Sequence, residues 1–208
     1  MRRIYLDNAA STPMDPEVLD YMMPYLRDFY GNPSSVHDHG RKLRAIIEKS
    51  RKEIANLIGA APAEIFFTSG GTEADNTAIK SSVMGMGIKH IVSTKIEHHA
   101  VTHPIEEMEK MGMIKATWLD VDEIGNPDLD QLADVLSKNE RSLVTLMHAN
   151  NEIGTILDLK AAGEICKEHN ALFHSDTVQS MANVKFDLAN TPIQFLSASA
   201  HKFYGPKG

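Results

Sequence analysis

Short apolar segments alternate with helical patterns along most of this 208-residue chain, and this alternation constrains the fold more than any other feature. The apolar segments predict strands at 64–69, 90–94, 113–121, 142–149, 171–176 and 192–199. Helical patterns fill most of the gaps, beginning near Gly71, Pro104, Leu129 and Leu159. Parallel strands need a long crossover between them, which a helix usually supplies, so the alternation predicts βαβ units. We therefore expect a three-layer α/β/α fold in which helices cover both faces of a mostly parallel sheet.

Two further helices are predicted before the first strand. The first begins at Pro16, with Asp15 as its N-cap. Its apolar face consists of Val18, Met22, Tyr25 and Leu26. The second has an apolar stripe from Leu43 to Ile58 and ends at Gly59. We expect residues 1–30 to form an N-terminal segment and helix, and residues 31–208 to form one large domain.

Composition excludes several classes of protein. The net charge of -7 argues against a broad nucleic-acid surface, which needs an excess of Lys and Arg. No apolar run approaches the roughly 20 residues of a membrane span. The N-terminus lacks the apolar segment of a signal peptide. The single cysteine, Cys166, excludes an internal disulfide, which is compatible with a reducing cytosol.

Segments with polar or ionisable groups follow five of the predicted strands, at the carboxyl ends where ligands bind in open parallel sheets. They are Gly70, Gly71 and Thr72, then Glu97, His98 and His99, then Asn150, Asn151 and Glu152, then Asp176 and Gln179, and finally His201 and Lys202. Because the carboxyl ends of parallel strands meet at one edge of the sheet, we expect these groups to form one site.

Three of these groups together describe a site for pyridoxal phosphate (PLP). Gly71 and Thr72 begin a predicted helix, whose N-terminus attracts a phosphate group. Lys202 follows the small residues of SASA, and confinement lowers the pKa of a lysine and frees its amine to attack a carbonyl. The carboxylate of Asp176 would pair with a protonated pyridine nitrogen. Each feature alone has an ordinary alternative. Thr72 could be the N-cap of its helix, Lys202 could be a solvated surface lysine, and Asp176 could be a turn or cap residue.

His98, His99 and His103 raise the possibility of a metal site, because the last two are four residues apart. The sequence has no HExxH motif and no cysteine pair, and Pro104 disturbs the helix, so we expect no metal. An imidazole stacked on a planar cofactor, serving also as a proton shuttle, suits His98 better. His99 and His103 are as well explained as structural or exposed residues.

The motifs YLDNAASTP, GNPSS, FTSGGTEADN, EHHAV, HANNEIGT, HSDTVQS and SASAHKFYGPKG occur in this order from residue 4 to the end. They closely resemble the cysteine desulfurases of the NifS/IscS type, which are PLP-dependent transferases of fold-type I and class V aminotransferase-like. The resemblance implies that Lys202 binds PLP covalently and that His98 stacks on its ring as an acid–base group. It implies that Asp176 faces the ring nitrogen and that Gln179 donates to the phenolic oxygen. The other implied contacts are Gly71, Thr72, Ser199 and His201 with the phosphate, Asn151 with a cofactor oxygen and the substrate, and Asn8, Ala10 and Asn32 at the substrate entrance.

The resemblance also implies a reaction and its partners. L-cysteine gives its sulfur to a nucleophilic cysteine thiolate of the enzyme and leaves as alanine. The persulfide sulfur then passes to iron–sulfur scaffold or tRNA-thiolation proteins. Family members are cytoplasmic homodimers.

The nucleophilic cysteine and the carboxylate-binding arginine of this family lie well beyond the cofactor lysine. Cys166 has helical spacing with Ala162 and Ile165, which is typical of a packed core thiol. We therefore expect an incomplete large domain, without the small C-terminal domain, that is inactive alone.

Two other interpretations remain open from the sequence. The first is another enzyme of the same superfamily, such as a selenocysteine lyase or a kynureninase-like hydrolase. The second is a non-catalytic interaction module whose α/β surface binds partners and whose pocket holds no cofactor.

Overall fold

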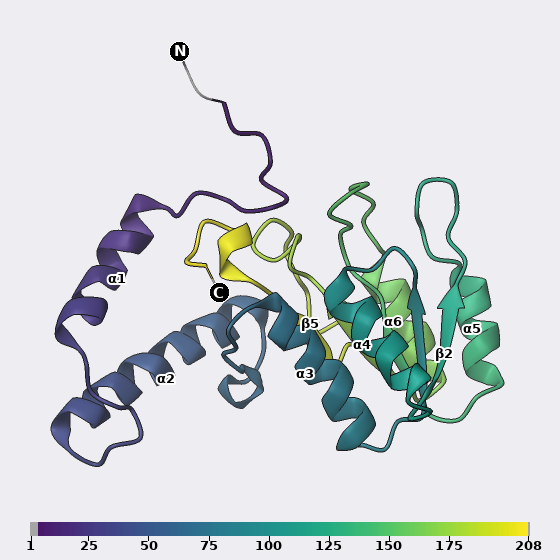
Figure 1. Cartoon of the computed structure of the whole chain (residues 1–208), viewed down its shortest axis with the longest axis horizontal. Coiled ribbons are helices and arrows are strands. Elements are labelled where there is room, and N and C mark those ends of the chain that lie inside the picture. Colours follow the sequence, from purple (N-terminus) through teal and green to yellow (C-terminus); the bar gives the residue numbers. More distant parts are fainter. Residues whose placement is uncertain (1–3, 208) are drawn as a thin grey trace.

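The computed structural model describes residues 4–207 and contains a five-stranded parallel sheet (Figure 1). The strands are β1 (His90–Thr94), β2 (Lys115–Leu119), β3 (Leu143–Thr145), β4 (Leu172–Asp176) and β5 (Phe195–Ser197). Their order is β2-β1-β3-β4-β5, and each neighbouring pair is parallel. The predicted α/β class and parallel sheet are confirmed.

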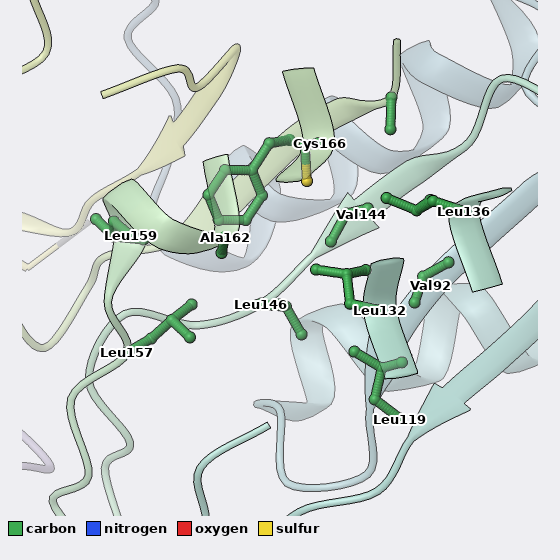
Figure 2. Close-up of a cluster of buried hydrophobic side chains, with 12 residues drawn as sticks. Val92, Leu119, Leu132, Leu136, Val144, Leu146, Leu157, Leu159, Ala162 and Cys166 are labelled. Atoms are coloured by element: carbon green, nitrogen blue, oxygen red, sulfur yellow. The ribbon is translucent and has the colours of Figure 1, made fainter. Parts of the chain in front are cut away.

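Four helices cover the two faces of the sheet. They are α3 (Gly71–Met84), α4 (His99–Lys110), α5 (Leu129–Ser137) and α6 (Leu159–Glu168). One core cluster packs Ile79 of α3 and Val101 of α4 against Ile91 of β1. On the other face, α5 and α6 pack against the sheet through a second cluster, shown in Figure 2. Its labelled members are Val92, Leu119, Leu132, Leu136, Val144, Leu146, Leu157, Leu159, Ala162 and Cys166. Each face of the sheet thus has its own helical layer, as predicted.

The predicted strand at 64–69 is wrong. The short helix η1 (Pro62–Glu64) begins this stretch, and its remaining residues belong to no strand of the described chain. Phe66 and Phe67 are 79% and 51% exposed. The Arg51 guanidinium lies 4.9 Å from the centre of the Phe67 ring and donates to a backbone carbonyl of the segment. The apolar pattern is typical of a strand, but the segment contacts Arg51 of the preceding long helix and does not pair with the sheet.

The two N-terminal helices, α1 (Pro16–Asp28) and α2 (Asp38–Ile58), extend away from the sheet (Figure 1). Their predicted ends are confirmed: the Asp15 side chain caps α1, and α2 ends at Gly59, whose φ of 74° favours glycine. No residue of α1 is fully buried: on the predicted apolar face Val18, Met22 and Tyr25 are half-buried and Leu26 is exposed. The division of the chain after residue 30 stays a prediction.

The other predicted elements are confirmed with shifted ends. β2, β3 and β5 are shorter than predicted, whereas β1 has its predicted bounds. α4 begins earlier than predicted because Nδ1 of His98 accepts a hydrogen bond from the Ala100 N–H at 3.1 Å and caps the helix. Within residues 4–207, no helix combines the length and apolar character that crossing a membrane requires.

Candidate active site

A cavity of about 580 Å³ lies at the carboxyl edge of the sheet. The segments that follow β1, β3, β4 and β5 contribute to its wall, together with the first turn of α3 and the N-terminal segment. The lining residues are Asp7, Ala9, Ala10, Gly71, Thr72, Asp75, His98, Met147, Asn151, Glu152, Asp176, Val178, Gln179, Ser199, His201 and Lys202. The parallel topology therefore brings chemically distinct groups from distant parts of the sequence to one place.

The cavity contains every residue that the sequence predicts to contact the cofactor, and it also contains Ala10. Asn8 and Asn32 are not among the described residues that line it. Asn32 lies before α2, where its side-chain oxygen accepts from the Ser34 N–H at 2.8 Å. The entrance role of Asn8 and Asn32 stays a prediction.

The first turn of α3 lines the cavity through Gly71 and Thr72. Gly70 is the N-cap, so Thr72 lies inside the helix and is not its cap. The first N–H groups of a helix have no partner within the helix, and the helix dipole favours an anion beside them. A Cβ atom on Gly71 would stand 2.8 Å from Cγ2 of Val178 and 3.5 Å from Cβ of Ser199. Glycine is therefore what allows the helix to begin this close to the opposite wall.

Asp176, the last residue of β4, is only 5% exposed. One of its carboxylate oxygens accepts from the Val178 N–H at 2.9 Å. Removal from water, reinforced by the nearby charge of Asp75, raises the pKa of Asp176 to about 6. The Val178 N–H, His174 and Lys202 oppose this rise. A cationic partner beside Asp176 would lower the pKa of this carboxyl group, because an opposite charge favours the ionised carboxylate.

Lys202 is half-buried in the short helix η2 (Ala200–Lys202). Its Nζ donates a hydrogen bond to the carbonyl oxygen of Ala9, which also accepts from Nε2 of Gln179 at 2.8 Å. Loss of water around the ammonium lowers the pKa of Lys202, although Asp176 and Asp7 oppose the shift. A lowered pKa makes the nucleophilic amine more available at neutral pH.

The N-terminal segment is bound across η2 by backbone hydrogen bonds. The Thr12 N–H donates to the His201 carbonyl at 2.9 Å, and the Asp15 N–H donates to the Tyr204 carbonyl at 2.9 Å. The Thr12 hydroxyl also donates to the His201 carbonyl, at 3.0 Å. These contacts place Ala9 and Ala10 in the wall of the cavity.

His98 reaches the cavity from the N-terminus of α4. Since Nδ1 accepts from a backbone N–H, the hydrogen-bond network assigns the ring proton to Nε2. Loss of water lowers the pKa of His98, and the charge of Asp75 opposes this shift.

The rings of His99 and His103 stack with centres 4.5 Å apart. In the part of the chain that the structure describes, no group of three or more His, Cys, Asp or Glu side chains could hold a metal ion.

Cys166 is 1% exposed, and its sulfur points into the cluster of Figure 2. Burial raises the pKa of this thiol to about 12. A nucleophilic cysteine must be a thiolate and must be accessible, so Cys166 meets neither requirement. The interpretation of Cys166 as a packed core residue agrees with its position in the structure.

Several cavity residues were not predicted from the sequence. They are Asp7, Asp75, Met147 and Val178. Asp75 carried a usable signal, because it is four residues after Gly71 and such pairs share a helix face.

The sequence profile of the family described as Aminotransferase class-V matches residues 4–208. The chain belongs to this family. Among class V relatives, a putative cysteine desulfurase IscS 1 of Bacillus subtilis (strain 168) is 47% identical over 211 residues, covering 100% of this chain and 55% of the relative. A cysteine desulfurase IscS of Dictyoglomus turgidum is 46% identical over 209 residues, covering 100% and 52%. This class V chain thus spans about half the length of the curated relatives it matches.

Two solved structures extend the comparison. A NifS-like protein has a TM-score of 0.94 at 37% identity, covering 100% of this chain and 57% of that one. A structure described as SspA in complex with cysteine has a TM-score of 0.94 at 36% identity, covering 99% and 59%. These matches confirm the fold and the resemblance to NifS and IscS proteins that the motifs predicted.

Proposed function

We propose that this class V chain forms most of the cofactor site of a PLP-dependent cysteine desulfurase. The observation that carries the proposal is that Lys202, Asp176 and the N-terminus of α3 open into one cavity. An amine, a carboxylate and an anion site are the groups that suit the aldehyde, the ring nitrogen and the phosphate of PLP.

The residues that line the cavity also suit the phosphate and the ring nitrogen of this cofactor. A side chain larger than hydrogen at Gly71 would collide with Val178, so the helix N-terminus is left open to a phosphate. Ser199 and His201 also line the cavity and would add a hydroxyl and an imidazole to the phosphate contacts. Asp176, buried with a raised pKa, would gain a cationic partner in a protonated pyridine nitrogen.

When bound, PLP supplies an electron sink that makes the α-proton of an amino acid removable. Lys202 would hold PLP through Nζ, and its lowered pKa favours the amine that this attachment needs. Asp176 would keep a proton on the ring nitrogen. Gln179 would donate to the phenolic oxygen. His98 would stack on the ring and offer the hydrogen on Nε2 to a reacting atom.

L-cysteine is the substrate that the relatives support. Two of them are described as cysteine desulfurases, and SspA is described in complex with cysteine. In this proposal Asn151, in the segment after β3, contacts the substrate and a cofactor oxygen. Ala10 would line the approach from the opposite side.

The thiol that accepts the sulfur is not supplied by Cys166, because that side chain is buried and protonated. These 208 residues contain no other cysteine. We therefore expect little or no desulfurase turnover from these residues alone. In the intact enzyme we propose a homodimer that passes persulfide sulfur to iron–sulfur scaffold or tRNA-thiolation proteins.

Titration of the PLP-loaded chain with L-cysteine tests the proposal. We expect a change in the visible absorption of the bound cofactor, without sulfide release above that of free PLP. Lys202→Ala should abolish the visible band, whereas Lys160→Ala, on the exposed side of α6, should keep it. A chain that binds no PLP would favour the non-catalytic interpretation. A spectral response to kynurenine or selenocysteine but not to cysteine would favour the other superfamily enzymes.

A further inference from the structure

Asp75 is a buried carboxylate that lines the cavity and has no part in the chemistry proposed above. It lies four residues after Gly71 in α3, on the side of the helix that faces the cavity. Its side chain is almost fully buried, and its Oδ1 atom makes no hydrogen bond within the described chain. Because burying a carboxylate without partners is unfavourable, a compensating contact is expected.

His174 supplies this contact. It lies two residues before Asp176 on β4, so the two side chains project from the same face of the strand. The ring is fully buried, and its Nε2 lies 3.5 Å from Oδ1 of Asp75 and 3.0 Å from Oγ of Ser197. Its Nδ1 lies 2.7 Å from Oγ1 of Thr145. If Nδ1 accepts from the Thr145 hydroxyl, the proton is on Nε2, where it is shared with Ser197 and lies beside the Asp75 carboxylate without a hydrogen bond to it.

The charge of Asp75 reaches the other titratable groups at this end of the cavity. These are Glu97 and His98 after β1, and His174 and Asp176 on β4. Asp75 raises the pKa of Glu97, His98 and Asp176, so its charge favours a proton on each of them. A basic nitrogen placed beside Asp176 would experience the same field.

We propose that Asp75 is a positioning residue whose charge, beside the buried imidazole of His174, adds to that of Asp176 and keeps the PLP ring nitrogen protonated. The inference rests on the proposed function, because it requires PLP in this cavity. Two carboxylates rather than one would then set the charge state of the ring. Asp75 would act through the field that it creates and would not need to touch the cofactor.

Nuclear magnetic resonance of PLP carrying ¹⁵N at the ring nitrogen tests the proposal in the 208-residue chain. In the native chain we expect the chemical shift of a protonated ring. Asp75→Asn should move the chemical shift toward that of an unprotonated pyridine. It should also raise the Kd for PLP by about tenfold, because charges interact strongly in a site removed from water. Asp130→Asn, an exposed aspartate of α5, is the matched control and should change neither quantity.

Two variants of His174 supply a test that does not depend on changing Asp75. His174→Gln keeps an N–H for Asp75 and should preserve the ring-nitrogen signal, whereas His174→Leu removes the N–H and should shift it. Equal ¹⁵N shifts in the native chain, Asp75→Asn and His174→Leu would overturn the inference and leave the proposed function intact. If Asp75→Asn does not fold, the contrast between the two His174 variants decides the question. A native chain that does not bind PLP would overturn the proposed function itself.

Discussion

Gln179 and Lys202 donate hydrogen bonds to the same acceptor, the carbonyl oxygen of Ala9. The first side chain follows β4 and the second belongs to η2, yet both converge on one point of the N-terminal segment. In the proposed function, Gln179 faces an oxygen and Lys202 faces the aldehyde carbon of the same cofactor. Their convergence is the geometry that such a ligand requires.

Replacement of Gln179 by Leu should weaken PLP binding without preventing it. The variant keeps the size of the side chain but removes the donor to the phenolic oxygen. We expect binding to be about fivefold weaker, from the ~1 kcal/mol that a typical hydrogen bond contributes. Absorbance titration with PLP measures the affinity. An unchanged affinity and an unchanged visible band would show that Gln179 does not contact the cofactor.

Gly71→Ala should damage the anion site while leaving the fold intact. The new Cβ would stand 2.8 Å from Cγ2 of Val178, a β-branched side chain that cannot easily rotate away. Overpacking of this kind typically costs about 1–3 kcal/mol. We expect weaker binding of PLP and of inorganic phosphate as its competitor. Ser81→Ala, on the exposed side of the same helix, is the control and should bind both normally.

Cys166 should be unreactive in the folded chain. A buried thiol with a pKa of about 12 provides almost no thiolate at neutral pH. We expect Ellman's reagent to modify it only after unfolding. Cys166→Ala should keep PLP binding and lower the free energy of unfolding by about 1 kcal/mol, because a small group is lost from the core. Rapid modification of the native chain would contradict the buried position.

Asp176 should make the stability of the cofactor-free chain depend on pH. Its pKa in the folded chain, about 6, is above the ordinary value of 3.8, so the folded state binds the proton more tightly. The free energy of unfolding should therefore fall as the pH rises from about 4 to about 6. Since one pKa unit corresponds to about 1.4 kcal/mol, the loss amounts to roughly 3 kcal/mol.

Asp176→Asn isolates this effect from the other titrating groups. The variant keeps an acceptor for the Val178 N–H but carries no charge, so it should be more stable than the native chain above pH 7. The difference should shrink below pH 4. Urea unfolding of both proteins across this range measures it, and a difference that does not vary with pH would count against the buried charge.

The central strands could be predicted from sequence because they consist mostly of residues that favour buried strands. All five residues of β1 and all five of β4 are buried, and each segment is short and bounded by helical patterns. Segment 64–69 has a similar composition but no strand beside it in the described chain. An apolar composition indicates that a segment can form a strand. Whether a neighbouring strand is present to pair with it depends on the tertiary fold.

The structure brings most of the predicted site residues together in one cavity for a topological reason. Residues that follow strands, such as His98 and Lys202, could be gathered at one edge by the rule that parallel carboxyl ends coincide. The carbonyl oxygen of Ala9 accepts hydrogen bonds from side chains more than a hundred positions away, and no local pattern encodes these contacts. Asp75 lies inside a helix, where an acid ordinarily faces solvent, and its burial depends on His174 from another element.

Reduction of the PLP-treated chain with borohydride, followed by peptide mass spectrometry, tests the central claim most directly. We expect a phosphopyridoxyl group on Lys202 in nearly every labelled molecule. The label should be lost in Lys202→Ala and retained in Lys160→Ala. Label spread over exposed lysines, or undiminished in Lys202→Ala, would contradict the account.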